Sequence, residues 1–517
     1  MDIGKVSLHT LSVPAALAGR YGATFTFSGS VLLDYTLPGD GKDFIRLATI
    51  QPDGRGFRPF FADVVPSKPT ANGIRFMCFP DRKRLLLGDY IMECTPDVDH
   101  CEKAALLPVC YPPMDAGDHT YVMHWSEIVV SPDNEHMAWT ALAGVGGSAN
   151  YTARLSRQEN CYRLENVQCI SDLAPWTTDD EHPGYVKPAC IRGGEIKQFV
   201  RGGEAISMAG MGNASRLADS VVQDLVTGEV TQITHTPGYD ETTIFSPDGR
   251  LGLVMSTRFS PTTNCAILTL LPRPFMRLAL SDILMPVYLY SVAGVRRRGG
   301  GNIGPALIDI ERSINEPDYL GVDLSDPSGE WQYCSPMSWH PGNRLGMWNE
   351  VSRNGRRRVR MVRLPEYVPG PAVPPARVPE RAACAVPADR VCPQAMVHPP
   401  VCRVKGRAEG EFTLTKAQGQ TLCTYEHYSE DGKTCYHGSE CVRRERERFV
   451  YEADLTCSGA HTGQMQLRLS FRCRYDSHEA WLEFDPDETG KPRSYGFSRH
   501  DGKTLTVEMM SQASGIE

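Results

Sequence analysis

Three histidines and a glutamine occupy similar positions in four separate segments of the chain. In each segment a polar side chain stands close to a tyrosine just ahead of an apolar run, and the four polar residues are His119, His182, His235 and Gln332. Equivalent loops of a repeated fold come together in space. Three imidazoles and an amide around one point are ligands that suit a divalent metal. The sequence therefore predicts a metal site built from these four loops.

Short strand pairs are the elements that would position these loops. Five segments read as a strand, a tight turn and a second strand, and they begin at Thr24, Phe76, Ile128, Ile244 and Met337. Proline, aspartate or asparagine, and glycine in the turns supply the backbone angles that tight turns need. The turn prolines are spaced by one or two periods of roughly 50 residues. Two degenerate repeats are therefore expected, one around 188–200 with its turn at Gly193-Gly194, and one between 281 and 319.

Six or seven repeats of this size, each a small sheet, predict an all-β architecture. We expect a six- or seven-bladed β-propeller over residues 1–365, because such blades bury their faces only against neighbouring blades. A proline-rich linker follows at 366–406. From 407 to 517, alternating segments separated by turn signals predict a C-terminal antiparallel β-sandwich or small barrel.

The composition excludes several classes of protein. The formal net charge is −8, so no nucleic-acid partner is expected. No apolar run approaches the roughly 20 residues that cross a bilayer, and the first residues lack a secretory pattern, so we expect a soluble, cytoplasmic protein without a membrane partner. The 17 cysteines are odd in number and scattered, which favours reduced thiols. The oligomeric state stays undetermined.

One turn carries a resemblance to a known family. The segment Phe245-Ser246-Pro247-Asp248-Gly249-Arg250-Leu251 resembles the repeat of TolB-like β-propellers, and the similarity covers roughly residues 20 to 365. Within that superfamily, the present histidines and glutamine are similar in type to the metal ligands of oligogalacturonate lyase. The resemblance implies a manganese-like divalent metal, a small acidic saccharide or glycoside in the propeller funnel, and β-elimination. The metal would neutralise a uronate carboxylate and acidify the adjacent proton.

Such an elimination requires a general base. Lys187 is the first candidate, on condition that its pKa is lowered, and Tyr185 and Tyr239 are alternatives. Further residues on the same loops and strand starts are expected to bind the substrate, an arginine among them because guanidinium groups clamp carboxylates. These residues are Tyr121, His124, Glu127, Glu241 and Arg258.

Two other functions remain open from the sequence. A pair of carboxylates at Glu127 and Glu241 would suit glycoside hydrolysis if both faced the channel. Alternatively, the propeller is a non-catalytic binding module for a protein or a sugar, and its histidines are ordinary loop residues. The sequence has no G-x-S-x-G elbow and no Walker-type loop, so α/β-hydrolase and P-loop chemistry are not expected.

Overall fold

The computed structural model describes residues 3–514, except 42, 67–75, 112–127, 144–146, 173, 175, 190–193, 211–216, 261, 294–302, 353, 384, 392–398, 446 and 475–478. Sheets dominate this part of the chain. No helix within it is long and apolar enough to cross a membrane. The cysteines that the structure describes are all free thiols.

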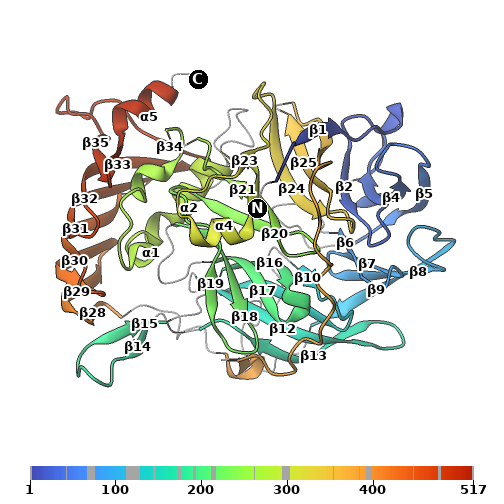
Figure 1. Ribbon diagram of the computed structural model, residues 1–517, viewed down its shortest axis with the longest axis horizontal. Helices are drawn as coiled ribbons and strands as arrows, with labels where there is room; N and C mark the ends of the chain where they lie inside the picture. The colour runs from blue at the N-terminus through green and yellow to red at the C-terminus, as the bar shows by residue number, and fades with distance from the viewer. Residues whose placement is uncertain are drawn as a thin grey trace.

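Six four-stranded antiparallel blades are arranged around a common axis, with the first strand of each blade innermost (Figure 1). Blades 1 to 3 consist of β2 (Tyr21–Phe25), β3 (Val31–Tyr35), β4 (Phe44–Ile50) and β5 (Arg58–Val64); β6 (Phe76–Cys78), β7 (Arg84–Leu87), β8 (Tyr90–Thr95) and β9 (Lys103–Cys110); and β10 (Ile128–Val130), β11 (His136–Ala143), β12 (Gly147–Arg157) and β13 (Tyr162–Cys169). A short parallel pairing of β9 with β13 joins blades 2 and 3.

The remaining blades are built in the same way. Blades 4 to 6 consist of β16 (Glu195–Val200), β17 (Ala205–Gly210), β18 (Asp219–Asp224) and β19 (Val230–Gln232); β20 (Asp240–Phe245), β21 (Leu251–Ser256), β22 (Gly304–Asp309) and β23 (Val322–Asp323); and β24 (Trp331–Trp339), β25 (Leu345–Ser352), β26 (Arg357–Arg363) and β1 (Ser7–Thr10). The predicted propeller is therefore confirmed, and the described residues form six four-stranded blades.

The two ends of the propeller close the ring together. The N-terminal strand β1 pairs antiparallel with β26 and so completes blade 6. Between blades 6 and 1, Asn349 Oδ1 accepts a hydrogen bond from the Ala23 amide at 2.8 Å, and its Nδ2 donates to the Ala23 carbonyl at 3.1 Å. Because residues far apart in the sequence share one blade, closure makes the blades stabilise one another cooperatively.

The turns between the first and second strands also link neighbouring blades. Asn134 and Asn343 hold left-handed positions, with φ of 65° and 60°, a conformation that asparagine tolerates. The Asn134 amide oxygen accepts from the Asp81 N–H at 2.8 Å, and the Asn343 oxygen accepts from the Asp248 N–H at 2.9 Å. The asparagine side chain of one turn thus accepts a hydrogen bond from a backbone N–H group in the turn of the preceding blade.

The two degenerate repeats differ from the sequence-based expectation. In blade 4, the turn between β16 and β17 lies at 201–204, and Gly194 precedes β16, so the predicted turn at Gly193-Gly194 is wrong. Between 281 and 319, the described residues form the end of a helical insertion, then β22 and α4 (Ile310–Asn315). The extra length therefore belongs to blade 5.

This insertion separates β21 from β22 and carries short helices. They include 3₁₀ turns at Cys265–Leu268 and Ser281–Ile283, the helices α1 (Met276–Ala279) and α2 (Leu284–Tyr288), and a π turn at Leu289–Ala293. Their apolar side chains pack together with those of the C-terminal region in one core. The rings of Phe275 and Phe412, for example, have centroids 4.4 Å apart. The insertion is the physical link between the propeller and the C-terminal region.

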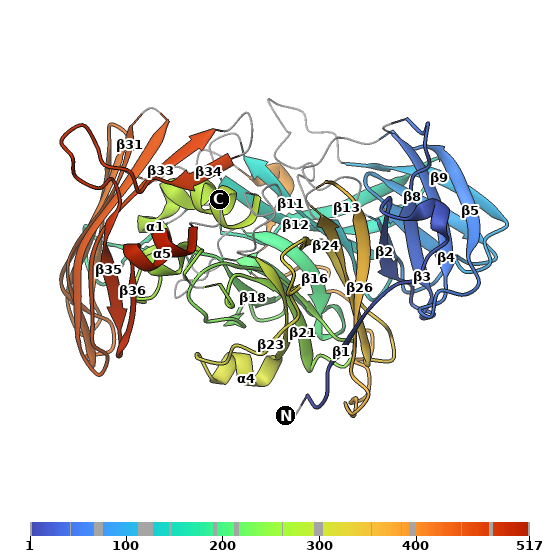
Figure 2. The ribbon, with the colours of Figure 1, turned by 90° about the horizontal axis from the view of Figure 1, so that it is seen from above.

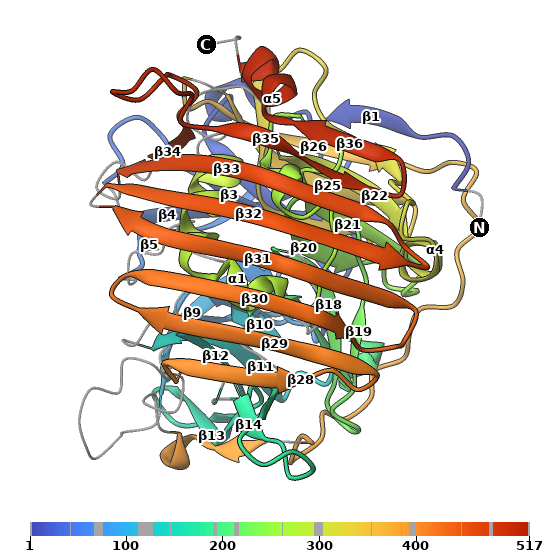
Figure 3. The ribbon, with the colours of Figure 1, turned by 90° about the vertical axis from the view of Figure 1, so that its left-hand side faces the viewer.

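The C-terminal region forms a single nine-stranded antiparallel sheet beside the propeller (Figures 1 and 2). Its strands, seen face-on in Figure 3, are β28 (Val401–Lys405), β29 (Glu409–Ala417), β30 (Gln420–Ser429), β31 (Thr434–Glu445), β32 (Arg448–Gly459), β33 (Gly463–Arg474), β34 (Glu479–Leu482), β35 (Tyr495–His500) and β36 (Lys503–Thr506), and α5 (Val507–Ser514) follows. The insertion helices supply the second layer that a sandwich would take from another sheet.

A buried ion pair fastens the insertion to this sheet. Arg273 donates from Nε to Glu440 Oε1 at 2.8 Å and from Nη2 to Glu440 Oε2, and both side chains are 1 % exposed. Its Nη1 donates to the carbonyls of Leu268 and Leu271. Tyr451 donates to Glu440 Oε2 at 3.0 Å. Opposite charge outweighs desolvation and raises the pKa of Arg273, although burial alone would lower it.

The proline-rich segment after the propeller is extended, and it is packed rather than free. We call residues 365–391 the strap. It crosses the turns of blades 5, 4 and 3 through hydrogen bonds from Tyr367 Oη to Asp248 Oδ2, Val373 N to Pro247 O, Ala376 N to Gly202 O and Val378 N to Asp133 Oδ2. Its short strand β27 (Val386–Pro387) pairs with β13.

Candidate functional site

The predicted metal ligand His182 lies outside the propeller channel. It sits in the turn of a hairpin, β14 (Trp176–Thr178) and β15 (Val186–Pro188), at the edge of the molecule next to β28 (Figure 1). Gln332, by contrast, is on β24, an inner strand of blade 6. The structure therefore does not bring His182 and Gln332 together. His119 lies outside the described residues.

The hairpin has its own charged cluster around Asp179. His182 Nδ1 lies 2.9 Å from Asp179 Oδ2, and Lys187 Nζ lies 3.0 Å from Asp179 Oδ1. Burial would raise the pKa of Asp179, but hydrogen bonds from His182 and Lys187 outweigh it and hold the pKa at about 2. The same contact raises the pKa of Lys187. A general base needs the opposite shift, so the condition set for Lys187 is not met.

Tyr185 fastens the hairpin to the C-terminal sheet. Its hydroxyl donates to Glu411 Oε2 at 2.6 Å, and Arg403 lies over its ring at 4.8 Å. The hydrogen bond to Glu411 raises the pKa of Tyr185. Tyr239 is likewise a packing residue: it is buried, and its ring lies 6.1 Å from that of Tyr288 in α2. Both tyrosines predicted as alternative bases thus have structural contacts.

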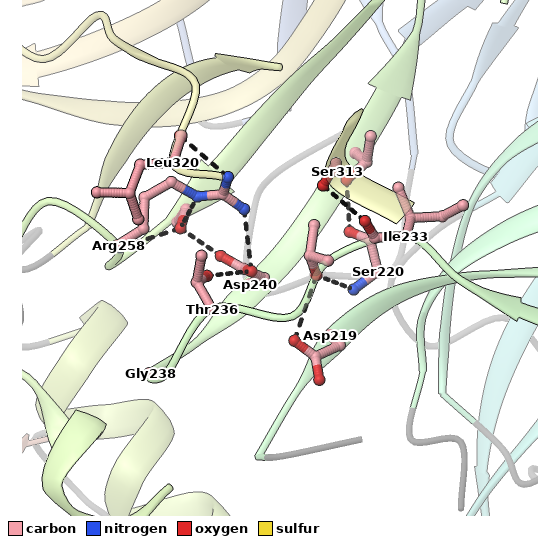
Figure 4. A network of polar contacts seen from close by, with 12 residues as sticks. Asp219, Ser220, Ile233, Thr236, Gly238, Asp240, Arg258, Ser313 and Leu320 are labelled. Carbon is pink, nitrogen blue, oxygen red and sulfur yellow. Dashed lines mark hydrogen bonds and ion pairs between the residues drawn. The ribbon is translucent and has the colours of Figure 1, made fainter. Parts of the chain in front are cut away.

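Arg258 is a buried partner of Asp240 and is not available as a clamp for a substrate carboxylate. Figure 4 shows its guanidinium between Asp240 and Leu320: Nη2 lies 3.0 Å from Asp240 Oδ2, and Nη1 donates to the Leu320 carbonyl at 3.1 Å. Thr236 also donates to Asp240 Oδ2. This network joins the loop before β20 to the start of the insertion, which explains why an arginine is buried there.

Glu241 does reach the inside of the propeller, where it meets a buried lysine. Lys197 Nζ lies 2.6 Å from Glu195 Oε2 and 3.4 Å from Glu241 Oε1, and the lysine side chain is 2 % exposed. Register shifts in the β16–β17 and β20–β21 pairings make Lys197 and Glu241 extra residues of two β-bulges. Bulges re-aim a side chain, which accounts for this meeting of two inner strands.

Of the remaining predicted residues, the structure describes His235 and Gln332. His235 is half-buried in the loop before β20. Gln332 is buried, and neither its amide nitrogen nor its amide oxygen has a hydrogen-bond partner among the described residues. Tyr121, His124 and Glu127 lie outside the described residues. The pair Glu127 and Glu241 therefore stays a prediction.

A cavity of about 210 Å³ opens between blades 5 and 6. It lies where β21 ends, β22 begins, and the loop from β23 leads into β24. Its lining combines three aromatic residues with hydroxyl and carboxylate groups, and the polar and aromatic members include Ser256, Phe259, Ser260, Asp323, Ser325, Asp326, Trp331, Tyr333 and Glu350. We call it the interblade pocket. Gln332 contributes to its wall, but strand alternation directs the Gln332 side chain away from the face that Trp331 and Tyr333 share.

Three carboxylates of the lining and two arginines beside the Trp331 ring set the electrostatics of the interblade pocket. Arg358 donates from Nε to Glu350 Oε2 at 2.6 Å and from Nη2 to Asp326 Oδ2, and its guanidinium lies 4.2 Å from the centre of the Trp331 ring. Burial raises the pKa of Asp326, but hydrogen bonds from Ser328 and Arg358 outweigh it and lower the pKa. Asp323 adds a further carboxylate, so three carboxylates face two guanidinium groups.

Sequence reasoning missed Trp331, Asp326 and Arg358. The available signal was the turn-forming run Asp326-Pro327-Ser328-Gly329 directly ahead of an aromatic strand start. That run lies close to the predicted Gln332, but it contains no histidine and so lacks the pattern of the other predicted loops. Arg356 and Arg358 belong to a basic run in the sequence, and both lie by the Trp331 ring.

The part of the chain that the structure describes is thus a β-propeller with six blades and an appended antiparallel sheet. No family model matches the chain, and no curated protein matches it. Similar solved structures include a TolB described as putative from Agrobacterium tumefaciens (13 % identity, 58 % of this chain and 75 % of that chain, TM-score 0.32) and TolB from Acinetobacter baumannii (14 %, 68 % and 65 %, TM-score 0.30). Prolyl oligopeptidase B from Galerina marginata is also similar (9 %, 79 % and 47 %, TM-score 0.30). These likenesses concern the fold alone.

Proposed function

We propose that this protein is a sugar-binding β-propeller whose interblade pocket holds one neutral saccharide unit. The observation that carries the proposal is the lining of that pocket, in which the half-buried Trp331 is surrounded by serine hydroxyls and by the carboxylates of Asp323 and Asp326. An aromatic ring offers an apolar surface to the C–H groups of a pyranose. Hydroxyls and carboxylates accept and donate hydrogen bonds along its rim.

Size and charge narrow the ligand. Pockets for drug-sized molecules usually measure about 300–1,000 Å³, so a cavity of about 210 Å³ suits a single sugar ring. The carboxylates of Asp323, Asp326 and Glu350 outnumber the two guanidinium groups described beside the pocket: Arg358 pairs with Asp326 and Glu350, and Arg356 lies 5.8 Å from the centre of the Trp331 ring. A uronate would meet repulsion in such a pocket. A neutral sugar is favoured over the acidic saccharide expected from the sequence.

Binding without elimination chemistry is the better-supported function. His182 and Gln332 lie on separate parts of the fold, and Lys187 has a raised pKa through Asp179. The metal-assisted lyase expected by resemblance would need His182 and Gln332 to lie together and the pKa of Lys187 to be lowered. The interblade pocket, by contrast, is lined by hydroxyl, carboxylate and aromatic groups of the kinds that bind polyols.

Calorimetric titration with a panel of neutral monosaccharides and their uronic acids tests the proposal. We expect binding of at least one neutral sugar, in the millimolar range or tighter, and weaker binding of the matching uronic acid. Trp331→Ala should abolish the heat signal, and Trp331→Phe should keep part of it because a ring remains.

His100→Ala is the matched control. His100 lines another polar cavity of about 350 Å³, with Ser28, Ser30 and Asp97, between blades 1 and 2. This substitution should leave sugar binding unchanged. Loss of binding in His100→Ala but not in Trp331→Ala, or no binding of any neutral sugar by folded protein, would refute the proposed function.

A further inference from the structure

Two histidines and an aspartate meet at one end of the C-terminal sheet, far along the chain from the interblade pocket. His461 lies in the loop between β32 and β33, and His500 and Asp501 lie where β35 turns into β36. Strands β33 and β35 are paired, with Gly463 opposite His500. The sheet register therefore places the two connections side by side.

Backbone hydrogen bonds fix this arrangement. Asp501 Oδ1 accepts from the Thr462 N–H at 2.9 Å, and the Asp501 N–H donates to the Thr462 carbonyl at 2.9 Å. Asp501 and Gly502 have φ of 45° and 81°, the left-handed values of a two-residue hairpin turn. The carboxylate is thus held by both connections before any ligand binds.

The three side chains offer their ligand atoms to one point. His461 Nδ1 lies 2.7 Å from Asp501 Oδ2, and His500 Nε2 lies 3.6 Å from the same oxygen. One atom from each residue lies within 4.8 Å of the others. Donor atoms around a tetrahedral zinc ion are about 3.3 Å apart, given metal–ligand bonds of about 2.0–2.1 Å. Shifts of well under 1 Å for the two aspartate contacts would reach that geometry.

Charge separates this cluster from the other group of candidate ligands. Around Asp179, Glu181 and His182, the ammonium of Lys187 lies 3.0 Å from Asp179 and 4.0 Å from Glu181. The positive charge of Lys187 already balances these carboxylates, so a metal ion there would have to compete with the ammonium group. In the described part of the chain, Asp501 forms ion pairs with His461 and His500 and with no lysine or arginine.

We propose that His461, His500 and Asp501 bind one divalent first-row transition metal, Zn²⁺ being the representative ion. Imidazole nitrogen and carboxylate oxygen are ligands that such metals accept. Three protein ligands leave at least one position for water. The metal would clip the β32–β33 loop to the β35–β36 turn and stabilise that end of the sheet. This inference is independent of sugar binding.

The test uses full-length protein produced without a histidine tag and stripped with a chelator. Titration with Zn²⁺ by calorimetry should give one ion per chain and a higher melting temperature. His461→Ala and His500→Ala should each weaken binding by at least about 10-fold, the loss that even outer partners of a metal site produce.

His437→Ala is the control. His437 stacks on His427 on the same sheet, with ring centroids 4.6 Å apart, so it tests for nonspecific capture by surface histidines. Its metal affinity should equal that of the unmodified protein. Co²⁺ gives a second readout, because thiolate ligation produces an intense near-ultraviolet band and nitrogen–oxygen ligation does not. Absence of one-to-one binding by folded protein, unchanged affinity in His461→Ala and His500→Ala, or a thiolate band would overturn the proposal.

Discussion

Removing the Arg273 side chain should weaken the attachment of the C-terminal sheet to the propeller insertion. The Arg273→Met substitution replaces the guanidinium by an apolar side chain of similar length and leaves the Glu440 carboxylate without its cationic partner. Breaking one partner of a buried ion pair costs about 3–5 kcal/mol. Arg273 and Glu440 are each 1 % exposed, so the upper part of that range applies. Tyr451 continues to donate to Glu440, and this hydrogen bond offsets only part of the loss.

The assay is urea unfolding followed by near-ultraviolet circular dichroism, with a double-mutant cycle. Arg273→Met alone should lower the free energy of unfolding by about 3–5 kcal/mol. The double variant Arg273→Met with Glu440→Leu should lose clearly less than the sum of the two single variants, because no buried charge is left unpaired.

Arg403→Met provides the comparison on the same sheet. Arg403 pairs with Glu411 at 2.8 Å, but its side chain is 50 % exposed, and exposed pairs contribute about 0–1 kcal/mol. If Arg273→Met destabilises the protein no more than Arg403→Met does, the buried pair is not the joint between the two parts. Additive single variants would refute the coupling in the same way.

Two further predictions concern the strap. Gly202→Ala should loosen the strap, because a Cβ at φ +73° would lie 2.4 Å from the Pro374 carbonyl oxygen. Gly355 has a similar φ of +77° but open space around it, so Gly355→Ala should destabilise the protein only through backbone strain, by about 1 kcal/mol. Limited proteolysis of the strap distinguishes the two, and equal cleavage would contradict the contact. Burial raises the pKa of Asp248, but hydrogen bonds, including that from Tyr367, outweigh it and lower the pKa. The ionised Asp248 therefore stabilises the folded protein above the unfolded pKa near 3.8, and this stabilisation is lost as pH falls through the lower folded pKa. Asp248→Asn should make cleavage of the strap less sensitive to acid. Tyr367→Phe should shift the onset of acid-induced cleavage to higher pH, because the folded pKa of Asp248 would be less depressed.

The blades could be predicted because their information is local. The turn Ser246-Pro247-Asp248-Gly249 carries its own backbone preferences, and β20 and β21 flank it as expected. In the C-terminal region, alternation predicted strands correctly. It could not predict that helices from the insertion, such as α1, cover one face of the sheet, because that contact joins segments far apart in the sequence.

The site was harder to predict, for reasons that individual residues illustrate. His182 and His235 have the same local pattern, but the hairpin that carries His182 bonds to Glu411 through Tyr185 and leaves the propeller. Glu241 meets Lys197 through two β-bulges, and a one-residue register shift leaves no clear mark in a sequence. The sequence therefore predicted the positions of these loops along the chain, but it could not predict where their side chains lie in the fold.

A crystal structure of the protein soaked with the tightest-binding neutral sugar tests sugar recognition most directly. The sugar ring should lie against Trp331 between blades 5 and 6, with hydroxyls near Ser325 and Asp323. Density for the sugar at another surface, with this cavity holding only solvent, would contradict the assignment of the interblade pocket.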